Sequence, residues 1–292
     1  MLSGWSRSWR HKSTAFNKDK MVQIQYASDL HITDWPKGTA FETFITPVAP
    51  ILVVAGDICS AWDPLYKNFL VWCSRHWHIV ILITGNHEYY PLAGHTVTID
   101  QTDQYIRSIV PHNVIFLQAG QSYTIPGTHL RFVGATLWSA IDPALWQEAA
   151  EKKGDYKHIS IGVPMMGVRK AHPCDTTALH ALHKAYLTSA VASQHYKETL
   201  IVVTHHMPTL NLLEERFRGE RWHSCYVSAD DELLAPNVKL WICGHSHRAT
   251  QWRAPSGTLC LMNARGYNKP GEQQRTEDIY NLRAVVDVAL QR

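Results

Sequence analysis

The feature that most constrains this chain is a series of short apolar runs, each followed at once by polar residues. The runs are β-type in composition and cover residues 22–26, 51–55, 79–84, 200–203 and 239–243. The polar groups that follow are, in chain order, Asp29-Leu30-His31, Gly56-Asp57, Gly85-Asn86-His87-Glu88, Thr204-His205-His206 and Gly244-His245-Ser246-His247. Open α/β sheets gather their functional residues at the carboxyl ends of strands. We therefore expect these groups to meet at one edge of a sheet.

The residue types in these groups indicate a site for two metal ions. Asp, His and Asn side chains without Cys suit first-row divalent or trivalent metals such as Mn, Fe, Zn or Ni. One carboxylate must bridge two closely spaced ions, and Asp57 stands between the two halves of the set. Two ions roughly 3.5–4 Å apart can clamp a phosphoryl group and make hydroxide available near neutral pH. The pattern therefore predicts hydrolysis of a phosphoester by a metal-bound hydroxide.

Together, Asp-x-His, Gly-Asp, Gly-Asn-His-Glu, a His after a strand and Gly-His-x-His resemble the motifs of the calcineurin-like metallophosphoesterases, from residue 22 to about residue 288. This resemblance implies an α/β fold, a four-layer α-β-β-α sandwich of two mixed sheets. It also implies a set of metal ligands. These are Asp29, His31 and His247 for the first ion and Asn86, His205 and His245 for the second, with Asp57 bridging.

The resemblance further implies roles for residues beside the metals. His87 is similar to the family residue that contacts the phosphate and helps the leaving oxygen depart, so we expect it to be catalytic. Glu88 is expected to orient His87. Neighbouring residues on an extended segment point in opposite directions, so His205 and His206 cannot both face one metal. The pattern His-His-x-Pro favours His205, which leaves His206 as a candidate substrate-binding residue.

A segment near the C-terminus carries a finer resemblance. Residues 263–267, Asn-Ala-Arg-Gly-Tyr, resemble the Asn-Pro-Arg-Gly-Tyr segment of a bacterial and phage branch of the family, with Ala264 in place of the usual Pro. Arg265 is a candidate substrate-binding residue that would contact phosphate. The alternative is a structural Arg that caps a turn, because Arg serves both purposes well.

Three readings of the function stay open. A small phosphomonoester or phosphodiester is the favoured substrate. A non-catalytic scaffold of the same fold is the first alternative, although such proteins usually lose ligands and this chain keeps them all. A nuclease acting on nucleic-acid ends is the second, but it would need a basic stripe that the dispersed Lys and Arg do not form. The acidic and Arg signature of Ser/Thr protein phosphatases is missing after Gly56-Asp57.

Composition and length place the site in an ordinary globular chain. Of 292 residues, 45% are hydrophobic and 18% charged, and the formal net charge of +3 is too small to indicate a nucleic-acid or membrane surface. No apolar run reaches the roughly 18 residues that span a bilayer. Six Cys without Cys-x-x-Cys spacing favour free thiols in a reducing compartment, so we expect a cytoplasmic protein.

The chain divides into an extension and one domain. Residues 1–20 are basic and Ser-rich, and we expect a disordered, dispensable extension there. Residues 21–292 are expected to form a single phosphoesterase domain with a cap-like insertion around 138–175. Helices are expected near 41–50, 65–76, 95–110 and 176–191, and a meander of strands at 114–117, 122–125 and 130–133.

Overall fold

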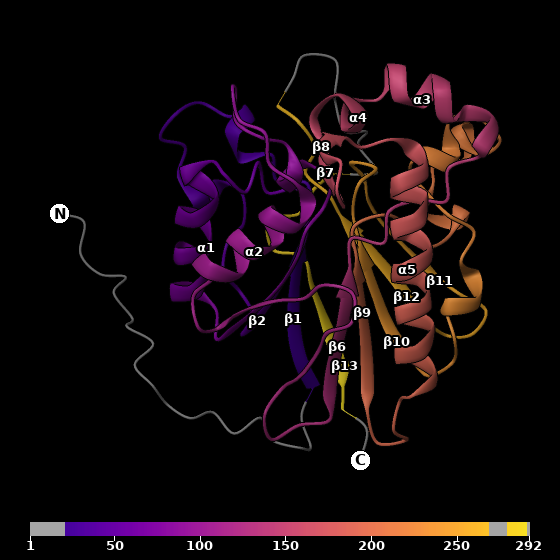
Figure 1. The fold of residues 1–292 in the computed structure, drawn as a ribbon. Coiled ribbons are helices and arrows are strands. Elements are labelled where there is room, and N and C mark those ends of the chain that lie inside the picture. Colours follow the sequence, from indigo (N-terminus) through magenta and orange to yellow (C-terminus); the bar gives the residue numbers. More distant parts are fainter. Residues whose placement is uncertain (1–20, 269–278, 291–292) are drawn as a thin grey trace.

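Two β-sheets lie face to face at the centre of the fold, in a computed structural model that describes residues 21–268 and 279–290 (Figure 1). The strands of the first sheet are β1 (Met21–Ala27), β2 (Ile51–Ala55), β3 (Ile79–Ile83), β4 (Val114–Phe116) and β13 (Val285–Ala289). Their order is β13-β1-β2-β3-β4. Strands β1 to β4 run parallel, and β13 pairs antiparallel with β1 at the edge.

The second sheet repeats this mixed arrangement. Its strands are β5 (Ser122–Thr124), β6 (Leu130–Ala135), β9 (Thr199–Thr204), β10 (Val238–Cys243), β11 (Ala249–Arg253) and β12 (Leu259–Asn263). Their order is β11-β12-β10-β9-β6-β5, with the four central strands parallel and the two outer strands antiparallel. In each sheet the parallel strands therefore end at one common edge.

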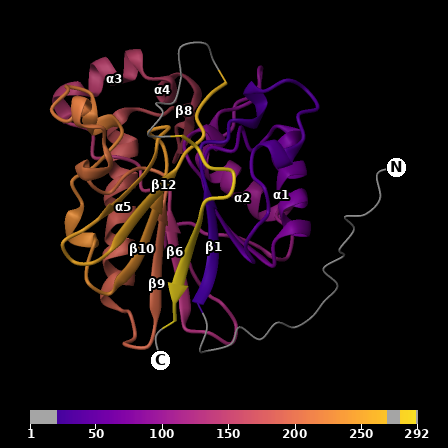
Figure 2. The same cartoon turned by 180° about the vertical axis from the view of Figure 1, so that it is seen from behind.

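Helices cover the outer face of each sheet, as the two views show (Figures 1 and 2). Helices α1 (Pro64–His76) and α2 (Ile99–Ile109) pack on the first sheet, and α5 (Pro173–Ala192) packs on the second. Residues of β2 alternate between the core under α1 and the core between the sheets. A strand that is buried on both faces is apolar at nearly every position, which is why the sequence of β2 is a continuous apolar run. The expected four-layer α-β-β-α sandwich is confirmed.

Two expectations for the first half of the chain are wrong. The strands over 114–133 do not form a meander, because β4 pairs with β3 in the first sheet whereas β5 and β6 pair with each other in the second. Residues 41–50 form only a 3-10 turn, η2 (Phe41–Thr43). There the Gln25 side chain donates to the Thr46 carbonyl and accepts from the Val48 amide, which replaces helical hydrogen bonds.

Two stretches are irregular, and the first of them lies at the top of Figure 1. The first carries η4 (Pro143–Leu145), α3 (Trp146–Lys152), α4 (Gly154–His158), β7 (Ser160–Val163) and β8 (Gly167–Lys170). The second follows β9 and carries η5 (Leu210–Leu212), η6 (Glu215–Phe217), η7 (His223–Cys225) and η8 (Asp231–Leu233). The first stretch has an apolar core of its own around Trp138, Leu145 and Tyr156. The first stretch coincides with the cap expected around residues 138–175, the second lies outside that range, and the cap itself stays a prediction.

Helix α5 begins at Pro173, three residues before its expected start, because His172 and Asp175 form a capping box at its N-terminal end. All six cysteines lie in the described part of the chain and are free thiols, as expected. No helix described here is long and apolar enough to span a bilayer. The extension at residues 1–20 lies outside the described residues.

Candidate metal centre

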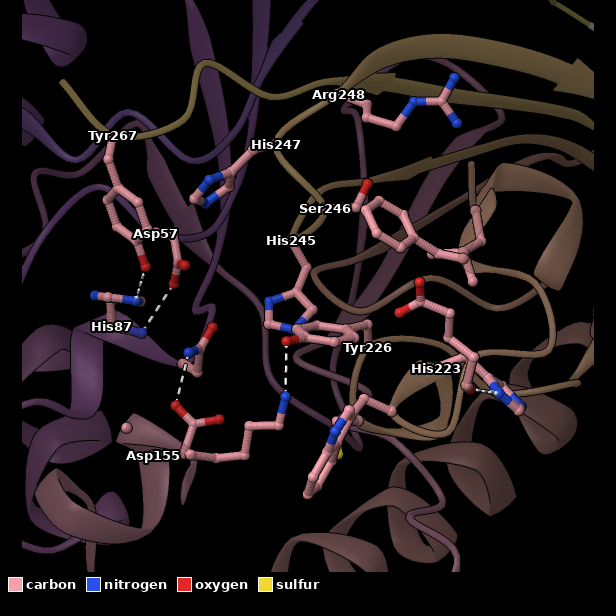
Figure 3. A pocket seen from close by; sticks show the side chains of 18 of the residues that line it. Asp57, His87, Asp155, His223, Tyr226, His245, Ser246, His247, Arg248 and Tyr267 are labelled. Atoms are coloured by element: carbon pink, nitrogen blue, oxygen red, sulfur yellow. Dashed lines mark hydrogen bonds between the residues drawn. The ribbon is translucent and has the colours of Figure 1, made fainter. Parts of the chain in front are cut away.

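All seven predicted metal ligands meet at the edge where the parallel strands of both sheets end. Asp29 and His31 follow β1, Asp57 follows β2 and Asn86 follows β3. From the second sheet, His205 follows β9, and His245 and His247 follow β10. The two sheets thus contribute ligands to one centre, as Figure 3 shows for Asp57, His245 and His247.

Sharp turns aim these side chains at one another. The φ angles of Asp29, His31, Asp57, His245 and His247 are 53°, 41°, 57°, 74° and 52°. Non-glycine residues seldom adopt this left-handed conformation, and where they do the strain often marks a functional site. The chain therefore turns abruptly after β1, β2 and β10, and these turns direct the candidate ligands that they carry into the space between the sheet ends.

Glycines beside the ligands allow the turns to approach closely. A Cβ atom on Gly85 would lie 2.1 Å from Asp57 Oδ1, and one on Gly244 would lie 2.5 Å from Asp29 Oδ2. Any larger residue at these positions would displace a ligand carboxylate. The glycines of the Gly-Asn-His-Glu and Gly-His-x-His motifs are thus required by space, since neither has a positive φ angle.

The first set of donor atoms comes from Asp29, His31 and His247. The Nε2 atoms of His31 and His247 lie 3.1 Å apart, and His247 Nε2 lies 3.5 Å from Asp29 Oδ1. Asp57 Oδ2 lies 3.8 Å from His31 Nε2, so the predicted bridging carboxylate reaches this set.

The second set joins Asp57, His205 and His245, with Asn86 beside them. His205 Nε2 lies 3.3 Å from Asp57 Oδ2, 3.2 Å from His245 Nδ1 and 3.2 Å from Asn86 Oδ1. The same Asp57 oxygen therefore faces both sets. This shared position is the one that a bridging ligand needs.

The carboxylates and imidazoles of the centre favour one another's charged forms. Burial acts to raise the pKa of Asp57, but the imidazoles of His205, His87 and His31 hold it well below its usual range. Burial likewise opposes charge on His205, yet Asp57 and Asp29 raise its pKa to about 10. Buried carboxylates are stable only when paired or bound to metal. Oxygen and imidazole donors without thiolate fit first-row cations, so the residues present fit two such ions.

His87 lies beside this centre. Its backbone N–H donates to Asp57 Oδ1 at 2.8 Å, and its Nε2 atom lies 2.8 Å from the hydroxyl of Tyr267 (Figure 3). The ring stacks on Tyr90 with a centroid distance of 4.4 Å. The side chain is therefore held in place by contacts on two sides, with its Nε2 atom next to the centre.

A cavity of about 650 Å³ opens over the centre. Its lining includes Asp57, Asn86, His87, His245 and His247. The rest of the wall includes residues of both irregular stretches, among them Lys153, Asp155, Phe217, Trp222 and Tyr226, together with residues outside them such as Tyr267. The Lys153 ammonium donates to the Tyr226 hydroxyl at 2.8 Å and lies 4.5 Å from the centre of a Trp222 ring. The wall thus carries several aromatic rings, and the Lys153 ammonium lies against two of them, Trp222 and Tyr226.

Comparison with known proteins agrees with this geometry. The family model described as calcineurin-like phosphoesterase matches residues 24–249, more than half of the chain. The chain belongs to this family.

Two related proteins extend the comparison of this calcineurin-like phosphoesterase. The uncharacterized protein L509 of Acanthamoeba polyphaga mimivirus is 23% identical over 229 residues, which cover 74% of this chain and 78% of that one. The crystal structure of the phosphopantetheinyl hydrolase PptH from Mycobacterium tuberculosis has a TM-score of 0.66 at 17% identity. It covers 87% of this chain and 94% of that chain. At this identity the match shows a common fold.

The role expected for Glu88 in this phosphoesterase is wrong. Its carboxylate accepts hydrogen bonds from the backbone N–H groups of Asp57, Ile58 and Gly85, at 3.0, 2.8 and 2.7 Å. Adjacent side chains diverge, so Glu88 points into the protein whereas His87 points to the pocket. Burial, reinforced by Asp57, raises the pKa of Glu88 to about 8. Glu88 therefore ties the turn after β2 to the turn after β3.

The two candidate substrate-binding residues lie behind the pocket wall. The buried His206 ring stacks on His245 at a centroid distance of 4.0 Å. The Arg265 guanidinium lies 4.1 Å from the centre of the Trp35 ring and donates to the Thr43 carbonyl. Neither residue is among the described residues that line this cavity. These contacts favour the structural alternative for Arg265, and substrate binding by either residue stays a prediction.

Sequence reasoning missed two parts of this site. In the segment that contains Arg265, it is Tyr267 that reaches His87. No site role was predicted for the part of the cavity wall that the second irregular stretch forms, with Phe217, Trp222 and Tyr226. The available signal was the placement of three aromatic residues in a Gly- and Arg-containing stretch directly after a ligand-bearing strand, where loops supply binding residues.

Proposed function

We propose that this phosphoesterase uses a dinuclear metal centre to hydrolyse a small organic phosphomonoester or phosphodiester. One observation carries the proposal. The oxygen Asp57 Oδ2 lies 3.8 Å from His31 Nε2 in the first donor set and 3.3 Å from His205 Nε2 in the second. A buried carboxylate between two imidazole-rich sets is the arrangement that two neighbouring cations require.

The residues of the chain have separate tasks in this reaction. Bound ions supply Lewis acidity, which polarises the phosphoryl group and lowers the pKa of a water molecule. The His87 backbone N–H holds Asp57 Oδ1, which leaves Oδ2 facing the two donor sets. We expect His87 Nε2 to contact a phosphoryl oxygen or to give a proton to the departing oxygen. The Tyr267 hydroxyl fixes the position of that nitrogen.

The size of the cavity supports a substrate that has an organic leaving group of moderate size. A volume of about 650 Å³ falls within the roughly 300–1,000 Å³ typical of small-molecule sites. Phe217, Trp222 and Tyr226 offer apolar area next to the centre. Among the described residues of the wall, Lys153 and Arg248 are the only Lys or Arg. A nucleic-acid channel needs a longer row of cations.

The test is hydrolysis of para-nitrophenyl phosphate, its bis ester and cyclic nucleotides, with metal content measured on the same samples. We expect metal-dependent turnover by the wild-type protein. His87→Ala should keep its metal and lower turnover by roughly 10²–10⁴-fold, the usual worth of a positioned acid or base.

His245→Ala is the matched control, because it removes a ligand rather than a catalytic group. This variant should lose metal and turnover together. If the wild-type protein hydrolyses none of these esters, or if His87→Ala turns over as fast, a non-catalytic scaffold becomes the better account.

A further inference from the structure

One carboxylate connects the first irregular stretch to a ligand of the second ion. Asp155 lies in helix α4, and its Oδ1 atom accepts a hydrogen bond from Asn86 Nδ2 at 2.8 Å (Figure 3). Asn86 lies 69 residues earlier, after β3. No motif in the sequence links the two residues.

The contact decides which end of the Asn86 amide faces the ions. A carboxamide has one oxygen and one NH₂ group, and only the oxygen can bind a cation. An ionised carboxylate accepts hydrogen bonds and donates none, so it holds the NH₂ group and excludes the flipped amide. The opposite atom, Asn86 Oδ1, then lies 3.2 Å from His205 Nε2, inside the second donor set.

We propose that Asp155 is a positioning residue that selects the metal-binding orientation of Asn86 and so sets the affinity of the second ion site. This inference rests on the dinuclear centre of the proposed function. Partners that orient metal ligands commonly change metal affinity by roughly 10–100-fold when removed.

Asp155 Oδ1 also contacts Tyr90, which packs against His87. The Tyr90 hydroxyl donates to Asp155 Oδ1 at 2.7 Å, and the Tyr90 ring stacks on His87. Helix α4 approaches Tyr90 so closely that a Cβ atom on Gly154 would lie 3.0 Å from the Tyr90 hydroxyl. Asp155 therefore connects the first irregular stretch to Asn86 at the second ion site and to Tyr90, which supports His87.

The experiment titrates metal-free protein with Mn²⁺, followed by calorimetry and by electron paramagnetic resonance, which separates coupled ion pairs from single ions. Asn86→Ala identifies the binding step that belongs to the second ion. Asp155→Ala should weaken that same step by roughly 10–100-fold and leave the other step unchanged. The spin-coupled pair should then form only at higher Mn²⁺ concentration.

Two further variants separate positioning from charge. Asp155→Asn keeps an oxygen that can accept from Asn86 but also carries an NH₂ group that can donate to the flipped amide, so it should recover only part of the affinity that Asp155→Ala loses at the second step. Glu151→Ala removes an exposed carboxylate from the neighbouring helix α3 and should match wild type.

Unchanged binding of both ions by Asp155→Ala would overturn the inference, as would equal losses in the Ala and Asn variants. The outcome is separable from that of the proposed function. A wild-type protein that binds two Mn²⁺ ions but hydrolyses no phosphoester would contradict the enzyme, and the titration would still test Asp155.

Discussion

A single imidazole, His183 on α5, holds a strained turn near the metal centre. Its Nδ1 atom accepts a hydrogen bond from the Leu137 backbone N–H at 3.1 Å. Leu137 and Trp138 both have left-handed backbones, with φ angles of 67° and 57°. Trp138 in turn packs against His206, which stacks on the ligand His245. The neutral ring of His183 is therefore part of the support beneath the second donor set.

We expect His183 to make stability fall in mild acid. Burial, followed by the nearby His180, lowers the pKa of His183 to about 4, below the roughly 6.5 of an unfolded chain. Between these values the unfolded state binds more protons, so the free energy of unfolding falls as the pH drops from 6.5 to 4. Denaturant melts of metal-free wild type and His183→Gln should show a wild-type advantage at pH 7 that disappears by pH 4. An advantage that is constant with pH would contradict this assignment.

Strand ends and their turns are the elements that build the centre. The parallel strands of both sheets stop at one edge, and the turns after β2, β3 and β10 carry glycines that lie against a neighbouring turn. The turn after β10 shows the constraint clearly. Its Gly244 lies against the Asp29 carboxylate and the Ser28 side chain from the end of β1. Close packing of the turn after β10 against the end of β1 thus depends on the absence of a Cβ atom at residue 244.

Gly244→Ala should therefore weaken the first ion site. The new Cβ atom would lie 2.5 Å from Asp29 Oδ2, which must move away from its partners. Overpacking of this kind typically costs about 1–3 kcal/mol of stability. Metal content and the denaturant midpoint should both fall. Gly162→Ala in β7 is the control, because its Cβ atom would meet only Thr98 at 3.9 Å. Full metal content in Gly244→Ala would show that the turn can relax.

In the whole molecule, the candidate metal centre lies between the strand ends of the two sheets. Asp29, His31, Asp57 and Asn86 come from the first sheet, and His205, His245 and His247 come from the second. Ions bound there would contact both sheets at once, whereas an unfolded chain holds these ligands far apart. Metal binding should consequently stabilise the entire fold.

Removal of metal with a chelator should lower the melting temperature. A free ion at a hundred times its dissociation constant adds about 2.7 kcal/mol of stability. For a chain of this size the change is on the order of 5–10 °C. Calorimetric melts of wild type with Mn²⁺ or chelator measure it. Asp57→Asn, which lacks the shared anionic ligand, should respond little. An equal shift in both proteins would place the stabilising ions elsewhere.

The strands and the ligand positions were determined by the sequence itself. Buried parallel strands must be apolar on both faces, so β2, β3 and β9 appear as uninterrupted apolar runs. Ligands follow such runs directly, and parallel strands end together, so their meeting could be predicted before any coordinates. The expectation of two layers of mixed sheet came from family resemblance rather than from these local patterns.

Only the tertiary structure decided which further side chains reach the centre. Tyr267 contacts His87 and Asp155 contacts Asn86, although both lie far from these partners in sequence, and Trp222 lines the cavity over the centre. Glu88, next to His87, turns away from the centre. Local patterns report burial and periodicity, which depend on neighbours along the chain. The direction of a side chain after a turn depends on φ angles and on atoms from distant segments. That is why Arg265 and Tyr267, two residues apart, could be told apart only in the folded chain.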